Sequence, residues 1–197
     1  MAVFKQSRVL LGIALLFAAL PALAADAALE LATASGVSVK PLALHDAKAA
    51  VFVFVIHDCP ICNAYAPELE RLRLAYEPKG IAIYLVQTDP ELKAADALKH
   101  AAEYGFKGTV LMDVAHKLSQ SCGAKTAPEA AVVGADGKTL YLGRIDDLFA
   151  DFGQRRANAT THDLRAALDA IFAGLPAPKA AGPAIGCFIS EIKEPKK

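Results

Sequence analysis

Residues 51–67 read VFVFVIHDCPICNAYAP and join an apolar run directly to a Cys-x-x-Cys motif. The run at residues 50–56 is rich in Val and Phe, which is typical of a central strand covered on both faces. Pro60 follows Cys59, and proline is favoured at the first position of a helix because its missing N–H would be unpaired there. The sequence therefore predicts that Cys59 lies at the N-terminus of a helix, directly after a buried strand.

This position determines the chemistry expected of the two cysteines. Unpaired N–H groups and about half a positive charge at a helix N-terminus favour the thiolate, which is the reactive form of cysteine. Cys62 falls on the first turn, so the two sulfurs can close a small disulfide. We assign Cys59 as the exposed attacking sulfur and Cys62 as the sulfur that resolves the mixed disulfide. A protonated His57 would lower the pKa of Cys59 and an ionised Asp58 would raise it, so the net sign stays open.

Strands and helices alternate after this motif. An apolar stripe at helical spacing continues from the motif, with Pro67 expected to kink the helix. Apolar runs flank the turn Ala135-Asp136-Gly137, which is a strong hairpin signal. This order predicts an α/β fold with a mixed central sheet. The other expected elements are strands at 81–86 and 109–112, helices at 91–104 and 114–121, hairpin strands at 130–133 and 139–142, a short leading strand at 37–44, and a last helix from Thr160 or Thr161 to Ala173.

The N-terminus has the three parts of a secretory signal. Lys5 and Arg8 precede a 12-residue apolar stretch at 9–20, and Ala22-Leu23-Ala24 is a cleavage site of the A-x-A type. The stretch is shorter than the roughly 20 residues that span a bilayer. We therefore expect residues 1–24 to be a signal peptide and the mature protein to be periplasmic or secreted, with no membrane span. An uncleaved anchor is the alternative.

Composition and charge define the remaining organisation. The 197 residues are 54% hydrophobic and 21% charged, which indicates a globular domain. Basic and acidic residues both number 21, so there is no basic excess that would indicate nucleic-acid binding. We expect one domain at residues 25–173. Residues 174–197 are interrupted by prolines and are predicted to form an extended tail, laid on the surface or partly disordered.

Across residues 41–173 the chain resembles the thioredoxin-like superfamily. The resemblance rests on the strand before Cys59-Pro-Ile-Cys62, on Ala66-Pro67, and on Thr126-Ala127-Pro128 before a strand. It implies a thioredoxin-like three-layer sandwich, a mixed sheet flanked by helices. The distance from Cys62 to Pro128 implies an insert of a helix and a strand, at about residues 91–112, between the Cys-x-x-Cys helix and the proline loop. Exported redoxins of the alkyl hydroperoxide reductase/thiol-specific antioxidant group share such an insert.

The same resemblance implies the residues of the site. Pro128 is expected to be a cis-proline that completes the catalytic site with Cys59 and Cys62. The loop before it would pair with an incoming peptide as a short strand. The residues implied in substrate binding are Thr126, Ala127, Pro60 and Ile61. Exported redoxins also carry motifs similar to residues 57–63 and 143–147 and to Gly186-Cys187.

Cys122 and Cys187 leave two interpretations open. In an exported protein they are first read as a disulfide that ties the tail to the domain. Otherwise Cys122 is a buried thiol, and Cys187 reaches the Cys59–Cys62 site as a relay thiol or metal ligand. Residues 143–147 would form a polar rim, a cation site or, as preferred here, a solvated strand end.

We predict a thiol–disulfide oxidoreductase that exchanges disulfides with protein thiols and with a redox partner, with no cofactor and no resident metal. One alternative is a Cu(I)-binding module that uses the two thiolates, with His57, His116 or His162 as a third ligand. Another is a thiol peroxidase with an antioxidant role. Phe52 and Ile56 stand where peroxiredoxins require Pro and Thr, which disfavours peroxide reduction. No second Cys-x-x-Cys or His pair is present to complete a structural zinc site.

Overall fold

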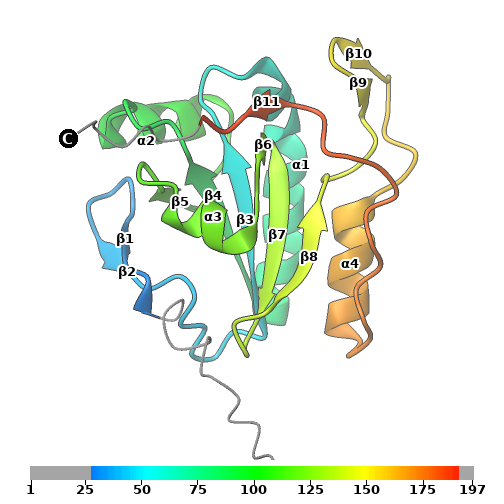
Figure 1. The fold of residues 1–197 in the computed structure, drawn as a ribbon, viewed down its shortest axis with the longest axis horizontal. Coiled ribbons are helices and arrows are strands. Elements are labelled where there is room, and N and C mark those ends of the chain that lie inside the picture. The colour runs from blue at the N-terminus through cyan, green and yellow to red at the C-terminus, as the bar shows by residue number, and fades with distance from the viewer. Residues whose placement is uncertain (1–27, 191–197) are drawn as a thin grey trace, which may run out of the picture.

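The computed structural model describes residues 28–190, and a five-stranded sheet forms its centre (Figure 1). The strand order is β5-β4-β3-β7-β8. The pairs β3–β4 and β4–β5 are parallel, whereas β3–β7 and β7–β8 are antiparallel, so the predicted mixed sheet is confirmed. The strands are β3 (Ala49–Val55), β4 (Ile81–Gln87), β5 (Thr109–Met112), β7 (Glu129–Gly134) and β8 (Thr139–Gly143).

Helices cover both faces of this sheet and complete a three-layer, thioredoxin-like sandwich. One hydrophobic cluster joins the sheet to residues of α1, α2 and α4, and a second joins its other face to α3 and to the N-terminal segment. The predicted insert between the Cys-x-x-Cys helix and the proline loop corresponds to α2 and β5. The helices are α1 (Pro60–Tyr76), α2 (Ala94–Glu103), α3 (Lys117–Cys122) and α4 (Asp163–Phe172), with a short 3-10 turn at Glu77–Lys79.

The strand β3 belongs to both clusters. Its residues alternate between the two faces, with Val51 and Val53 in the first cluster and Phe52 and Phe54 in the second. All seven of its residues are buried, as the apolar run predicted. Phe52 also stacks on Tyr84 of β4, with ring centroids 5.5 Å apart. Burial of both faces fixes the position at which β3 ends and the Cys-x-x-Cys motif begins.

Three pairs of short strands were not predicted as pairs. β1 (Leu31–Ala32) pairs with β2 (Ser38–Val39), and β9 (Phe149–Asp151) pairs with β10 (Gln154–Arg155). Of the leading strand expected at 37–44, only β2 is present. The third pair joins β6 (Thr126–Ala127) to β11 (Cys187–Phe188), 60 positions later in the chain. Strands of two or three residues are too short to show periodicity in the sequence.

The C-terminal segment has a defined course up to residue 190. After α4 it runs back along that helix and then crosses the end of the sheet to β11 (Figure 1). The side chains of Ala177, Ala180 and Ile185 pack against the first cluster. The segment is therefore extended and laid on the domain over its described part. The predicted signal peptide at 1–24 lies outside the described residues, and within 28–190 no helix is both long and apolar enough to cross a membrane.

The start of α4 differs from the prediction. The residue that precedes the helix is His162, and it makes no capping hydrogen bond through its side chain. Thr160 and Thr161 lie just outside the helix, and their backbone N–H groups donate to Asp147 instead. The expected threonine cap was wrong because a buried carboxylate from another segment binds these two residues.

A matched pair on α1 tests the packing of the first cluster. Leu72 is 2% exposed, whereas Leu74 is 60% exposed on the same helix. We expect Leu72→Ala to lower the free energy of unfolding by about 2–5 kcal/mol, because it removes buried methyl groups and leaves a cavity. Leu74→Ala should change it by less than about 0.5 kcal/mol. Urea denaturation measures both, and equal losses would contradict this packing.

Candidate functional site

The two cysteines of the motif lie where β3 meets α1. Cys59 has an extended backbone, with φ −81° and ψ 112°, and occupies the N-cap position of α1, and Pro60 begins the helix. Cys62 follows on the first turn, as predicted. Cys59 is 1% exposed and Cys62 is 3% exposed. The expectation of an exposed attacking sulfur was therefore wrong, since another part of the chain covers Cys59.

The proline loop lies directly against Cys59. The Ala127–Pro128 peptide bond is cis. In its thiol form, Cys59 Sγ donates to the carbonyl oxygen of Ala127 at 3.6 Å. The Ala127 side chain is fully buried, so the loop contacts Cys59 through its backbone. Of the other residues implied in substrate binding, Pro60 is exposed and Thr126 is half-buried, but Ile61 is buried in the first hydrophobic cluster and presents no surface.

Cys187 is the residue that the tertiary structure adds to this site. Its strand β11 pairs with β6 in a register that puts Cys187 opposite Ala127. Its thiol is close enough to that of Cys59 for each of the two groups to shift the pKa of the other. The predicted Cys122–Cys187 disulfide is not formed, because Cys122 is buried in the second cluster, on the other face of the sheet. The alternative, that Cys187 reaches the Cys59–Cys62 pair, agrees with the structure.

The three thiols at the site differ strongly in acidity. Hydrogen bonding from Cys62 is the main cause that lowers the pKa of Cys59 to about 5, with further hydrogen bonds from Cys187 and from backbone N–H groups of the first turn. Burial first, and then the hydrogen bond to Cys59, raises the pKa of Cys62. The same two causes raise the pKa of Cys187 to about 12. At neutral pH the site therefore holds a Cys59 thiolate beside two protonated thiols.

A chain of polar side chains borders the motif on the α2 side, and sequence reasoning missed it. The side-chain amide of Asn63 donates to the backbone oxygen of His57 at 3.1 Å. Its oxygen is 2.7 Å from Nε2 of His100, on α2. His57 Nδ1 lies 3.1 Å from a carboxylate oxygen of Asp89, an ion pair when the ring is protonated. Burial lowers the pKa of His100. His57 and Asn63 belong to the Cys-x-x-Cys region, but Asp89 and His100 come from other segments, so no local motif indicates these contacts.

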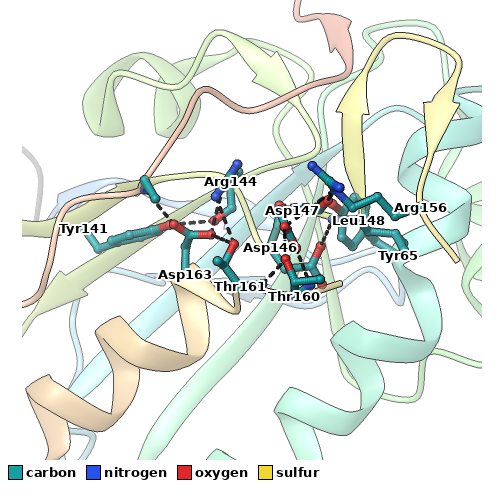
Figure 2. A network of polar contacts seen from close by, with 11 residues as sticks. Tyr65, Tyr141, Arg144, Asp146, Asp147, Leu148, Arg156, Thr160, Thr161 and Asp163 are labelled. Carbon is teal, nitrogen blue, oxygen red and sulfur yellow. Dashed lines mark hydrogen bonds and ion pairs between the residues drawn. The ribbon is translucent and has the colours of Figure 1, made fainter. Parts of the chain in front are cut away.

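The residues after β8 form a second polar network (Figure 2). Asp147 accepts hydrogen bonds from the backbone N–H groups of Thr160 and Thr161 and from the hydroxyl of Thr160. The hydrogen bond from that hydroxyl is the main cause that lowers the pKa of Asp147. Asp146 is buried beside Tyr65, and burial raises the pKa of its carboxyl group. The preferred interpretation of residues 143–147 as a solvated strand end was wrong, because their carboxylates are buried and hydrogen-bonded.

This network also holds the C-terminal segment. Arg144 donates from Nε to a carboxylate oxygen of Asp163 at 2.8 Å. The other oxygen of that carboxylate accepts the backbone N–H of Ala181 at 2.6 Å. Asp163 is in the first turn of α4 and is buried. Residues 144, 163 and 181 thus fix the segment to the domain six residues before Cys187.

The three histidines considered as metal ligands are in different environments. His116 is buried, and its Nε2 lies 2.6 Å from the backbone oxygen of Thr88, to which it donates. His162 is exposed at the start of α4. His57 is two residues from Cys59 but faces Asp89. Within residues 28–190, no group of three or more His, Cys, Asp or Glu side chains is arranged to hold a metal ion.

The sheet order, the Cys-x-x-Cys at the N-terminus of α1 and the adjacent proline loop define a thioredoxin-like redox protein. The model of the Redoxin family matches residues 18–153. The chain therefore belongs to the Redoxin family. Cys187 and the whole C-terminal segment lie beyond the matched residues. No curated protein matches the chain.

Solved structures show the same fold. A hypothetical protein from Sinorhizobium meliloti 1021 has a TM-score of 0.72 and 23% identity, covering 82% of this chain and 89% of that one. An uncharacterized conserved protein from Geobacillus kaustophilus has a TM-score of 0.71 and 27% identity, covering 84% and 89%. A secreted Mycobacterium tuberculosis disulfide oxidoreductase homologous to E. coli DsbE has a TM-score of 0.54 and 21% identity, covering 76% and 98%.

The acidity of Cys59 can be measured directly. We expect the ultraviolet absorbance of the reduced protein to show a thiolate forming with a midpoint near pH 5, because the hydrogen bonds at the site lower the pKa of Cys59 to about 5. The signal should be missing from Cys59→Ser and should remain in Cys122→Ala. A thiolate that forms only near the pKa of an ordinary cysteine, about 8.5, would contradict this geometry.

The same shift links stability to pH. The pKa of Cys59 is about 5 in the folded protein and about 8.5 in an unfolded chain, so the unfolded state binds more protons between these values. The contribution of Cys59 to the free energy of unfolding is therefore complete above about pH 8.5 and is lost as the pH falls through about 5. We expect the urea midpoint of the reduced protein, relative to reduced Cys59→Ser, to rise across this window. A constant difference would argue against the shift.

Proposed function

We propose that this protein is an exported thiol–disulfide oxidoreductase that exchanges disulfides with protein thiols through Cys59 and Cys62. One observation carries the proposal: a thiolate-forming cysteine at the N-terminus of α1 has a second, protonated thiol one turn away and a peptide-pairing loop beside it. Membership of the Redoxin family supports redox chemistry of the thioredoxin type. The signal peptide predicted at residues 1–24 and the secreted disulfide oxidoreductase among the structural neighbours support export.

The reaction follows from the difference between the two sulfurs. The Cys59 thiolate attacks one sulfur of a substrate disulfide, a bond forms between Cys59 and that sulfur, and the other substrate sulfur leaves. Cys62 then attacks Cys59, so the Cys59–Cys62 disulfide forms and the first substrate sulfur is released. The proton of Cys62 is transferred to a released sulfur. The substrate disulfide gains two electrons, and the two cysteines lose two. The reverse sequence would oxidise a substrate dithiol.

The raised pKa of Cys62 is consistent with its role as the sulfur that resolves the mixed disulfide. A buried, protonated Cys62 hydrogen-bonds to the Cys59 thiolate and stabilises it while no substrate is bound. When Cys59 enters a mixed disulfide its charge disappears, and with it a charge that opposed ionisation of Cys62. Cys62 therefore becomes a better nucleophile only after the first step. This order limits premature reaction of Cys62 with solvent oxidants.

A set of substitutions tests the proposal. With a protein disulfide such as that of insulin as the probe, we expect Cys59→Ser to lower the rate of disulfide exchange by a factor of 10³ or more, because the attacking sulfur is lost. The double variant Cys62→Ser/Cys187→Ala should accumulate the mixed disulfide, detectable by mass, because neither neighbouring thiol is left to resolve it. Cys122→Ala is the matched control, since Cys122 lies on the other face of the sheet, and it should keep its rate.

Two outcomes would replace this proposal with the alternatives of the sequence analysis. If equimolar Cu(I) protects both Cys59 and Cys62 from alkylation and wild type exchanges no disulfide, the protein handles copper. If peroxide converts Cys59 to a sulfenate faster than any protein disulfide reacts, the protein is a peroxidase. Disulfide exchange that persists in Cys59→Ser would end the proposal itself.

A further inference from the structure

The C-terminal segment occupies the edge on which a substrate peptide would be expected. In the proposed function, the backbone of β6 beside the cis-proline pairs with a substrate as a short antiparallel strand. In the structure, β11 of the same chain already pairs with β6 antiparallel, with Cys187 opposite Ala127 and Phe188 opposite Thr126. A backbone hydrogen bond from the N–H of Ile189 to the oxygen of Lys125, at 3.0 Å, extends this pairing.

The register of this strand brings a third sulfur to the reacting one. Ala127 is next to both residues: its carbonyl oxygen is 3.6 Å from Cys59 Sγ, and its backbone is the partner of Cys187. The Cys187 and Cys59 thiols are close enough for each to shift the pKa of the other. A substrate cysteine has to reach the same place, because the mixed disulfide forms on Cys59. Cys187 thus occupies the position of a substrate sulfur.

The close approach of the segment depends on a glycine. A Cβ atom at Gly186 would lie 2.1 Å from the backbone oxygen of Ala127 and 2.6 Å from its carbonyl carbon. Both distances are too short for any side chain. Residue 186 therefore has no room for any side chain while Cys187 lies at Cys59. With the segment this close to the proline loop, Cys59 is only 1% exposed.

The pairing is short enough to be opened. β11 has two residues, and the side chain of Phe188 is 82% exposed, so it adds little packing. The hydrogen bond that holds the segment upstream of β11 is the one from the backbone N–H of Ala181 to Asp163. Ile185, Cys187 and Ile189 pack against the hydrophobic clusters but are only half-buried, and strands of this length are marginal by themselves. Residues 182–190 can therefore separate from β6 without disturbing the sheet or α4.

We propose that residues 185–190 are an internal substrate strand whose Cys187 forms a reversible disulfide with Cys59, and that outside substrates reach Cys59 only after this strand leaves β6. The inference rests on the proposed function, because it uses the same attacking sulfur. It makes Cys187 a third catalytic residue. The class of ligand that competes with it is a cysteine-containing peptide in extended conformation.

The exchange needs no outside oxidant once Cys59 and Cys62 are joined. Cys187 attacks Cys59, the Cys59–Cys62 bond breaks, and the Cys59–Cys187 bond forms. The proton lost by Cys187 is taken up by Cys62, which becomes a thiol. One disulfide and one thiol are present before and after, so the number of electrons does not change. The oxidising equivalent moves from the buried pair to the tail, where an outside thiol can reach it.

Disulfide mapping tests the covalent step. The chain is equilibrated with glutathione buffers of graded potential, acid-quenched, alkylated and mapped by mass spectrometry. In Cys62→Ser, where glutathione disulfide supplies the oxidant, we expect most of Cys59 to be linked to Cys187. In Cys187→Ala we expect only the Cys59–Cys62 disulfide. If Cys62→Ser carries glutathione on Cys59 and no link to Cys187, while wild type forms Cys59–Cys62, the inference fails and the proposed function stands. If wild type forms no Cys59–Cys62 disulfide, the proposed function fails.

Access to Cys59 tests the strand itself and uses two glycines of the same segment. Gly186→Ala should displace β11 and raise the alkylation rate of Cys59 at least tenfold over wild type. Gly182→Ala is the matched control, because its added methyl group meets the flexible end of the Arg144 side chain at 2.8 Å and not a backbone atom. It should leave the rate within about twofold. Circular dichroism and urea midpoints verify that both variants are folded. Equal alkylation rates in folded Gly186→Ala and wild type would overturn the inference.

Discussion

The burial of β3 on both faces is the constraint on which the rest of the structure depends. Its side chains alternate between two hydrophobic clusters, so the strand cannot shift by one residue without exchanging every contact. This fixes the point at which the chain leaves the sheet and enters α1. Cys59 lies at that point, against the loop that precedes β7, the antiparallel neighbour of β3. The chemistry of the site follows from this placement.

Three sulfurs with different acidities share the site. Cys59 is held as a thiolate by hydrogen bonds from Cys62, Cys187 and the first turn of α1, whereas burial keeps the other two protonated. A helix N-terminus alone would favour the thiolate, but here the neighbouring thiols have the larger effect. His57 and Asp58, the residues next to Cys59 in the sequence, are not its main partners. Acidity at this site is therefore a property of the folded arrangement of side chains from α1 and β11.

The second polar network explains why a segment outside the sheet keeps a defined course. Asp147 binds the two residues before α4, and Asp163 binds both Arg144 and the backbone of Ala181. Buried carboxylates need such partners, because leaving them unpaired costs free energy. A solvated strand end was the preferred expectation here, because Asp is rarely buried without a partner. Asp146 accepts the backbone N–H of Leu148 and lies beside Tyr65 of α1. The partners of Asp147 are Arg156, Thr160 and Thr161, which are 9 to 14 positions away.

The sequence by itself determined the fold class, the central strand and the placement of Cys59 and Cys62 at a helix start, because strand periodicity, the N1 proline and the Cys-x-x-Cys spacing are local signals. It also indicated the position of the loop at Pro128. Only the tertiary structure decided what covers Cys59 and which thiol Cys187 meets. The pairing of β11 with β6 joins two-residue strands that are 60 positions apart, and neither carries a pattern of its own. Such contacts depend on how the whole domain packs, because nothing in the local sequence of either segment indicates its partner.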